Sequence, residues 1–486
     1  MPDNKQKATR ATPLDALALP HVVEAIATSC GNHQDLESFL VAVPPSLWTP
    51  ALTAFLDCKT VMPSSVRANW PHIELHDIDL PPSVLARLAA TLPLHPRMEL
   101  LYPVGDAAPL ARLIDVLGPA LSGVELCILS DRTIDGRGKA ISNLLLQRCP
   151  RLRHVSIFVG SSPTTDMIEL NDLLAVVAHP HVHDLYINLQ RATGAPRLGH
   201  HLASWLSTAP ATKLNMSNVS AMDADGVIAF CNALQTNSTL QELVVSNVPS
   251  LGGFHGRTLP VSLETLTWGV CYRVVDQTVT DLATAVGPTR LKRLDCSVFG
   301  RLAKYRAAAP MLERLQCLMV SELNADEMGA LIAGLPAAPA LTTLSLHDCI
   351  LSLSAELLME TLATKCVRLG ALVVIDRHLT SNGFTAVLSG VVRLPYLTSL
   401  ILPMRLSDVL NLFPALAAAG RHLHYLDLSI LRRPEGDLER RAIYQALTQA
   451  HDVPFVLQSM PKDMDNFVAD ALSPCADRCH QCDLIL

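Results

Sequence analysis

The chain has 486 residues and a formal net charge of -7, which excludes a global electrostatic attraction to nucleic acid or anionic membranes. Apolar residues make up 49% of it but aromatic residues only 4%, which suits many thin layers of Leu, Ala and Val better than a few bulky cores. No apolar run reaches the roughly 18 residues that span a bilayer, and the start lacks the apolar core of a signal peptide. We expect a soluble protein of the cytoplasm or nucleus with reduced cysteines.

The sequence of residues 13–57 predicts three short amphipathic helices. We expect residues 1–12, which precede them, to be disordered. Apolar residues recur at helical spacing: Val22, Val23 and Ile26 in the first helix, Leu36, Phe39, Leu40 and Val43 in the second, and Leu47, Ala51 and Phe55 in the third. Leu19-Pro20 opens the first helix, and Gly31-Asn32 and Pro44-Pro45 separate the three. A bundle this small needs a neighbour or a partner to be stable.

The order of residues in this segment resembles the F-box, a three-helix module that binds the Skp adaptor of a cullin-type ubiquitin ligase. The matching positions are Leu19, Pro20, Val23, Ile26, Asp35, Leu36, Val43 and Trp70. The sequence departs from the family at Pro44-Pro45, where a Ser and a basic residue are usual, and Trp48 follows the valine by five residues instead of four. The resemblance implies adaptor binding through Leu19, Pro20, Val23, Ile26, Leu36, Phe39 and Leu40. The alternative is that residues 13–57 only cap the segment that follows.

A pattern of the form L-x-x-L-x-L then repeats along the chain. Copies begin at Leu152, Val182, Leu240, Leu263, Leu291, Leu312, Leu341, Leu369, Leu397 and Leu423, with looser copies at Gly123 and Ala211. Eight of the eleven gaps between successive copies are 28 to 30 residues long, which excludes chance and indicates a repeat architecture. Weaker copies at Trp70, Arg97 and Val453 would extend the array to residues 70–460.

The segments between these copies have helical periodicity. Apolar residues fall at i, i+3, i+4 and i+7 in five of them: Val227 to Leu234, Val279 to Val286, Met328 to Leu335, Phe384 to Val391 and Val409 to Leu416. Pro150, Pro180, Pro310, Pro339 and Pro395 stand two residues before a strand pattern, where proline ends a helix. The gaps of 23 and 21 residues, after Leu240 and Leu291, predict shortened helices.

This alternation resembles the leucine-rich repeat family, in the helix-bearing class typified by ribonuclease inhibitor. The resemblance implies an α/β solenoid, a horseshoe with parallel strands on the concave face and helices on the convex face. The family places Asn or Cys three residues after the last leucine of each strand. Cys349 fits that position well, while Phe299, Val320 and Leu431 occupy its equivalents.

Residues between the leucines of each strand should point away from the core, where a partner protein would bind. Our candidates are Arg153, His154, Phe158, Tyr186, Lys292, Arg293, Thr343 and His347. The same outward positions include Ser156, His183, Asp184, Asn188 and Asp295, and in the copy at Leu312 Glu313 and Arg314. Mixed charge with an occasional aromatic residue suits a protein partner better than phosphate or a small molecule. P-loop, zinc-protease and nucleophile-elbow motifs are missing from the sequence, so we expect no enzyme.

We therefore predict the substrate-recognition subunit of a cullin-type ubiquitin ligase, monomeric within a hetero-complex, with no nucleic-acid partner. The alternative is a repeat scaffold or inhibitor unrelated to ubiquitin.

Two groups of potential metal ligands remain. The run "HPHVH", His179 to His183, has no acidic or Cys residue close by in sequence, which favours a structural role. In the C-terminal tail, residues 461–486, Cys475, Cys479, His480 and Cys482 could hold one zinc ion; the alternative is an unliganded, reduced tail. No other cofactor is expected. The single cysteines in apolar segments, such as Cys231, Cys296 and Cys317, predict small buried hydrophobic residues.

Overall fold

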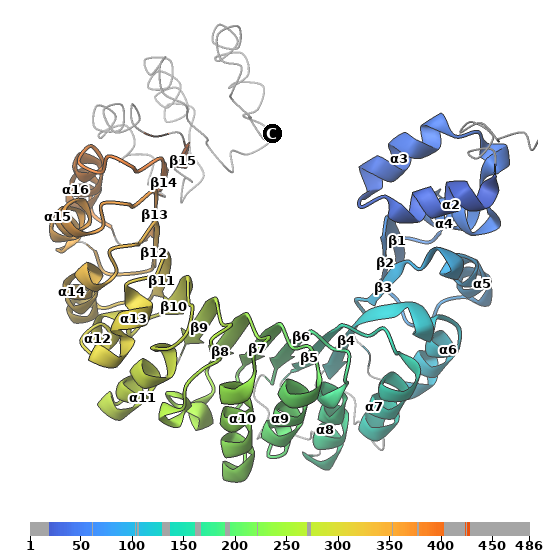
Figure 1. The fold of residues 1–486 in the computed structure, drawn as a ribbon, viewed down its shortest axis with the longest axis horizontal. Helices are drawn as coiled ribbons and strands as arrows, with labels where there is room; N and C mark the ends of the chain where they lie inside the picture. The colour runs from blue at the N-terminus through green and yellow to red at the C-terminus, as the bar shows by residue number, and fades with distance from the viewer. Residues whose placement is uncertain are drawn as a thin grey trace, which may run out of the picture. The chain divides into compact units, whose positions relative to one another are not determined.

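The computed structural model describes residues 19–60, 62–102, 104, 106–128, 137–160, 167–189, 195–220, 222–269, 274–351, 353–376, 379–402, 423 and 425–427. The chain forms two compact units. Unit 1 comprises residues 1–233 with 248–250, and unit 2 comprises residues 234–247 with 251–486. In each unit short strands alternate with helices, which lie on one side of the strands (Figure 1).

From residue 19, where the described residues begin, unit 1 has three helices and continues as strand–helix repeats. The helices are α2 (Pro20–Ser29), α3 (His33–Ala42) and α4 (Pro50–Thr60), with a 3-10 turn η1 (Pro45–Leu47) before α4. The repeats comprise β1 (Val66–Asn69), β2 (His72–Leu75), α5 (Pro82–Ala90), η2 (Leu92–Leu94), β3 (Arg97–Leu100), α6 (Ala107–Leu117), η3 (Gly118–Ala120), β4 (Leu121–Ile128), α7 (Arg137–Arg148), β5 (His154–Val159), α8 (Met167–Leu174), η4 (Ala175–Ala178), β6 (Asp184–Asn188), α9 (Leu198–Thr208) and β7 (Lys213–Ser217). The division between the units falls within α10 (Ala224–Thr236).

The sheet of unit 1 follows the order of the chain. Strands β2 to β7 pair in parallel, each with its sequence neighbour. Strand β1 pairs antiparallel with β2, so that Val66 lies opposite Leu75. The sequence analysis missed β1, because its four residues, Val66–Asn69, carry no L-x-x-L-x-L pattern. The weaker copy at Trp70 is present as β2. The copy at Arg97 overlaps β3 but was assigned two residues too late, because the buried residues in register with Ile73 and Leu75 are Met98 and Leu100.

Unit 2 continues the same alternation of strands and helices. Its elements are β8 (Glu242–Ser246), η6 (Phe254–Gly256), β9 (Thr265–Gly269), α11 (Asp276–Val286), β10 (Arg293–Cys296), α12 (Phe299–Leu302), η7 (Arg306–Ala308), α13 (Ala309–Leu312), β11 (Cys317–Ser321), α14 (Ala325–Gly334), η8 (Leu335–Ala337), β12 (Thr343–His347), α15 (Ala355–Lys365), β13 (Ala371–Ile375), α16 (Ser381–Val391), β14 (Ser399–Ile401) and β15 (Tyr425–Asp427). The 3-10 turn η5 (Pro249–Leu251) follows β8, and its first two residues belong to unit 1. Strands β8 to β15 pair in parallel in chain order.

The pattern leucines form the core of the strands. In β12, Leu344 and Leu346 are both 0% exposed, and Leu344 is in register with Leu318 of β11 and Leu372 of β13. One strand and one helix cannot bury their own apolar edges, whereas stacked copies share one continuous core. The predicted α/β solenoid of parallel strands backed by helices is confirmed in each unit.

The repeat copy assigned to Leu312 is wrong by three residues. Leu312 ends the short helix α13, and Pro310 lies at the start of that helix instead of before a strand. The strand residues are those of β11, so the copy begins at Leu315 and continues through Leu318 and Val320. Glu313 and Arg314 therefore precede the strand and are not on its face. Arg314 instead donates hydrogen bonds to the carbonyls of Pro310 and Thr289.

The two shortened helices are confirmed. Between β8 and β9 the chain forms only the 3-10 turns η5 and η6, and between β10 and β11 it forms the four-residue helices α12 and α13 with η7. Elsewhere in unit 2 the helices between strands have 10 or 11 residues.

In three turns, the position three residues after the last pattern residue of the strand holds a buried Cys, Leu or Phe. Cys349 is 1% exposed, with its Sγ 3.3 Å from the carbonyl oxygen of His347. After β11 the equivalent position is Leu323, 2% exposed, instead of Val320. Phe299, at 0% exposure, fills it after β10. Burial of an apolar side chain can fix these turns where no amide is present.

Two of the three cysteines expected to be buried are buried, and one is not. Cys231 and Cys296 are 1% and 0% exposed, and burial raises the pKa of the Cys296 thiol to about 12. Cys317 is half-buried, because it lies on the open face of β11. The described residues include no helix long and apolar enough to cross a membrane.

Candidate binding surfaces

The three N-terminal helices have a small core of their own. Val23, Ala27, Leu36, Leu52 and Phe55 are each at most 1% exposed. Pro20 starts α2, where a missing N–H leaves no helix hydrogen bond unmade. The side chain of Asn32 caps α3, accepting a hydrogen bond from the Asp35 N–H at 2.9 Å.

Of the seven residues expected to bind an adaptor, some are buried in this core and others are exposed. Val23, Leu36 and Leu40 are at most 6% exposed and hold the helices together, so their side chains are not available to a partner. Leu19 is 45% exposed and Pro20 is exposed, while Ile26 and Phe39 are half-buried. Val41, which the spacing argument did not select, is 90% exposed. It follows Leu40 directly on α3, and adjacent helix residues face different directions.

Trp70 anchors the helices to the first strands of unit 1. Its side chain is 3% exposed and meets the ring of Phe55 edge-on, with 5.1 Å between the centroids. Its indole N–H donates a hydrogen bond of 2.8 Å to the carbonyl of Cys30, the C-cap of α2. Helix α4 also packs against α5 and β1. The segment therefore covers the first strands, as a terminal cap does.

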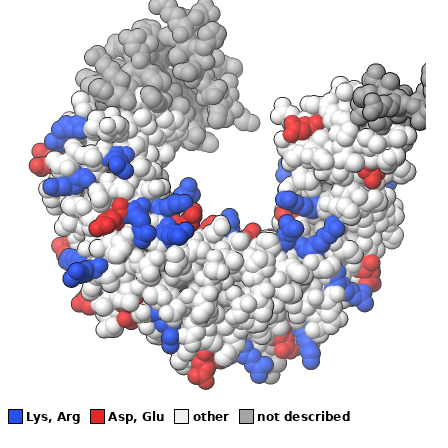
Figure 2. All heavy atoms as spheres, in the orientation of Figure 1, with Lys and Arg blue, Asp and Glu red and all other residues white. Residues whose placement is uncertain are grey.

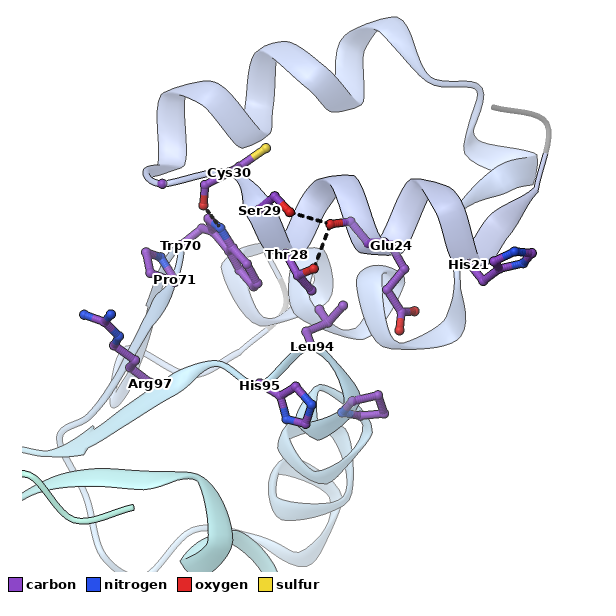
Figure 3. Close-up of a pocket in the computed structure, with 13 residues that line it drawn as sticks. His21, Glu24, Thr28, Ser29, Cys30, Trp70, Pro71, Leu94, His95 and Arg97 are labelled. Carbon is purple, nitrogen blue, oxygen red and sulfur yellow. Dashed lines mark hydrogen bonds between the residues drawn. The ribbon is translucent and has the colours of Figure 1, made fainter. Parts of the chain in front are cut away.

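A cavity of about 580 Å³ lies between α2 and the η2–β3 segment of unit 1. In Figure 3, Arg97 and Glu24 lie toward opposite sides of it, with Leu94 and His95 between them along one wall. The Nη1 of Arg151 lies 3.4 Å from the Nδ1 of His95. Sequence reasoning missed this cavity, since its walls come from segments some seventy residues apart that share no motif. It offers both signs of charge and no activated nucleophile.

The open strand face of unit 1 is polar. The candidates Arg153 and His154 are exposed, and Tyr186 and Phe158 are half-buried. Tyr186 belongs to a register row with Glu125, Ser156 and Asn215. Asp184 accepts a hydrogen bond of 2.8 Å from the hydroxyl of Thr212. This surface holds the mixed polar residues that the sequence analysis expected, with most of its charges solvated.

The open strand face of unit 2 brings the other candidates together in neighbouring rows. Arg293 and Thr343 lie in one row with Cys317 between them, and His347 lies in another. The exposed Lys292 precedes β10 and pairs with Glu264 at 2.9 Å. The ring Nε2 of His347 is 2.7 Å from the Ser345 hydroxyl. Both basic and acidic side chains are visible over β10 and its neighbours in Figure 2.

Asp295 is a further residue of this face, at one of the outward positions that the strand spacing predicted. Its side chain is half-buried on β10. Burial raises the pKa of its carboxyl group, and the nearby His347 opposes that rise. The carboxylate lies between Thr267 and Met319 of the adjacent strands.

The histidine run at residues 179–183 is part of the core of unit 1. His179 is 1% exposed, and its Nδ1 accepts a hydrogen bond of 3.2 Å from the N–H of His181. Burial lowers the pKa of His179, and His181 lowers it further. Within the described residues no group of three potential metal ligands comes together. Cys475, Cys479, His480 and Cys482 lie outside the described residues, as do residues 1–12 and the copy at Val453.

Comparison with known proteins gave no match to a family model and no match among curated proteins. A search of solved structures found similarity to the crystal structure of the Rad7 and Elc1 complex in yeast. The TM-score is 0.40 and the sequence identity 12%, covering 84% of this chain and 88% of that chain. The fold assigned above therefore depends on this chain's own strands, helices and register.

Proposed function

We propose that this chain is a protein-binding subunit of a cullin-type ubiquitin ligase, in which the N-terminal helices dock on the Skp adaptor and the open strand face binds a target protein. The observation that carries the proposal is the apolar surface left on α2 and α3 after their core has formed. Leu19 is 45% exposed and Val41 is 90% exposed. They flank a segment whose Leu19-Pro20 opening resembles that of the F-box.

In this role no residue of the chain performs bond chemistry. The helices would supply apolar contacts to the adaptor, whose burial drives association. The strand face would hold a target within reach of the ligase. Of the seven residues that the F-box resemblance implies, the four that are not buried are Leu19, Pro20, Ile26 and Phe39. We expect these four, together with the exposed Val41, to contact the adaptor.

The second candidate function is a repeat scaffold in which the N-terminal helices act only as a cap. The contacts of Trp70 with Phe55 and with the carbonyl of Cys30 favour it, because they attach the helices to the first strands. A cap needs those contacts but does not need an exposed Leu19 or Val41.

Adaptor binding by the purified full-length protein distinguishes the two. We expect the wild type to bind the Skp adaptor in isothermal titration calorimetry, and Leu19→Asp with Val41→Asp to weaken binding at least about tenfold, since a charge would have to be buried against an apolar partner. The matched control is Leu353→Asp, which changes a leucine 93% exposed in unit 2 and should leave binding unchanged. If the wild type does not bind, or the double variant binds like the control, the adaptor proposal is wrong.

A further inference from the structure

Seven residues of unit 2 form one continuous row across the open strand face. Each is in register with the next on the neighbouring strand. From β8 to β14 this middle row consists of Val244, Thr267, Asp295, Met319, Ser345, Val373 and Ile401. With strands about 4.8 Å apart, six steps span roughly 29 Å, the length of about nine residues of extended chain.

The middle row is more apolar than a solvated face requires. Val244, Met319, Val373 and Ile401 carry apolar side chains on the face opposite the helices, and Met319 is 37% exposed. A strand with one packed and one solvated face normally alternates apolar and polar residues. The corresponding row of unit 1, on the open face of β4 to β7, consists of the polar residues Glu125, Ser156, Tyr186 and Asn215. Four of the seven positions in the middle row are apolar, and Val373 and Ile401 are neighbours in register. Apolar side chains gathered on an open face suit a protein partner.

Asp295 is the one charged residue among these seven, and the register continues from Ile401 to Asp427 on β15. Within the described residues, no hydrogen bond or ion pair within 4.0 Å reaches the Asp295 carboxylate; His347 influences it only through its charge. The ring of His347 is hydrogen-bonded to Ser345. Arg293 shares the strand but acts on Cys317, whose thiol pKa it lowers against the stronger effect of burial. A half-buried carboxylate without a hydrogen-bond or ion-pair partner is unfavourable in the free protein, and a cation brought by a partner would relieve that cost.

We propose that the middle row binds an extended, aliphatic segment of the target protein, and that Asp295 receives one lysine or arginine side chain from that segment. This rests on the proposed function in using the strand face as the target site, but it does not require adaptor binding. An acidic segment would place like charge against Asp295. A segment of several basic residues would meet Arg293 in the adjacent row. One basic residue among aliphatic ones satisfies both constraints.

A selection from random dodecapeptides displayed on phage, with the full-length protein as bait, tests the proposal. We expect the selected peptides to share one Lys or Arg flanked by Leu, Ile, Val or Met. Their affinities would be measured as synthetic peptides by fluorescence anisotropy. Asp295→Asn should weaken binding at least about tenfold, as removal of one member of a desolvated charge pair does.

A double-mutant cycle shows whether the peptide's cation meets Asp295. Norleucine in place of the peptide's basic residue should weaken binding to the wild type and leave binding to Asp295→Asn unchanged. The matched control is Asp184→Asn, which neutralises a half-buried carboxylate on the strand face of unit 1 and should alter affinity less than twofold. Met319→Ala should weaken binding without changing the preference for a basic residue.

Three outcomes would overturn the proposal: no peptide is selected, the selected peptides lack a basic residue, or the cycle shows no coupling with Asp295. Adaptor binding by the same Asp295→Asn protein separates this inference from the proposed function. Intact adaptor binding with failed peptide binding rejects the middle-row site alone. Peptide binding as described, in a protein that never binds the adaptor, rejects only the ligase role.

Discussion

Replacing Trp70 should detach the N-terminal helices from the rest of unit 1. The indole is 3% exposed, contacts Phe55 edge-on and donates a hydrogen bond to the Cys30 carbonyl. Trp70→Ala removes a large buried ring and leaves a cavity, which typically costs about 4 kcal/mol. Trp70→Phe keeps an aromatic ring against Phe55 but loses the donor to Cys30, which should cost about 1 kcal/mol.

Hydrogen exchange of the full-length protein would show which helices and strands lose stability in the Trp70 variants. We expect Trp70→Ala to speed exchange in α2, α3 and α4 by up to roughly a thousandfold, since each 1.4 kcal/mol of opening free energy is about tenfold. Exchange in β5 to β7 should change little, because a repeat unit contacts mainly its neighbours. Trp70→Phe should give a rise of about fivefold in the same helices.

The matched control is Trp205→Ala. Trp205 is 0% exposed on α9 and donates a hydrogen bond of 2.8 Å to the Val182 carbonyl, so it is also a buried, hydrogen-bonded indole. Its loss should speed exchange around α9 and β6 and spare α2 to α4. Unchanged exchange in α2 to α4 after Trp70→Ala, or an equal rise throughout unit 1, would refute the anchor role.

Two further predictions concern stability. Leu344→Ala should lower the free energy of unfolding by about 3 kcal/mol, because Leu344 is 0% exposed and packs in register with its neighbours, while Thr343→Ala should change it by under about 0.5 kcal/mol; urea denaturation checks both, and equal effects would contradict the core assignment. Burial lowers the pKa of His179, so below the ordinary value of 6.5 the unfolded chain binds a proton that the folded chain does not. This contribution to stability is full above pH 6.5 and is lost as pH falls. Between pH 7.5 and 5.5, the free energy of unfolding measured with urea should therefore fall less for His179→Gln than for the wild type. An identical fall in the two proteins would contradict the burial of a neutral His179.

The sequence predicts the solenoid well because its signal is repeated. A single L-x-x-L-x-L could be any strand, but the recurrence at 28 to 30 residues leaves few other folds. The same pattern fails locally at Leu312, Leu315 and Leu318, which are three residues apart and satisfy the spacing in two registers. All three are at most 1% exposed, so burial does not distinguish the registers either. Only the placement of helix α13 against β11 does so.

The candidate sites are less predictable than the fold, since they depend on contacts between distant residues. Helical spacing identified Val23 and Leu36 as apolar helix residues but not that they would face inward while Val41 faces solvent. Trp70 follows Cys30 by forty residues, and their hydrogen bond has no sequence signature. The strand spacing placed Asp295 on the open face with Lys292 and Arg293, but it did not show that its neighbours in register are Thr267 and Met319.

The cap and adaptor interpretations of the N-terminal helices make use of different residues. The cap uses Trp70, Phe55 and α4, which face the strands. The adaptor role would use the side chains of Leu19 and Val41, which are 45% and 90% exposed. Exposure alone does not decide between them, since Leu353 of unit 2 is 93% exposed as well. A cap that served only unit 1 does not need exposed apolar side chains at positions 19 and 41, so these two side chains are the feature that the cap does not explain and an adaptor surface would.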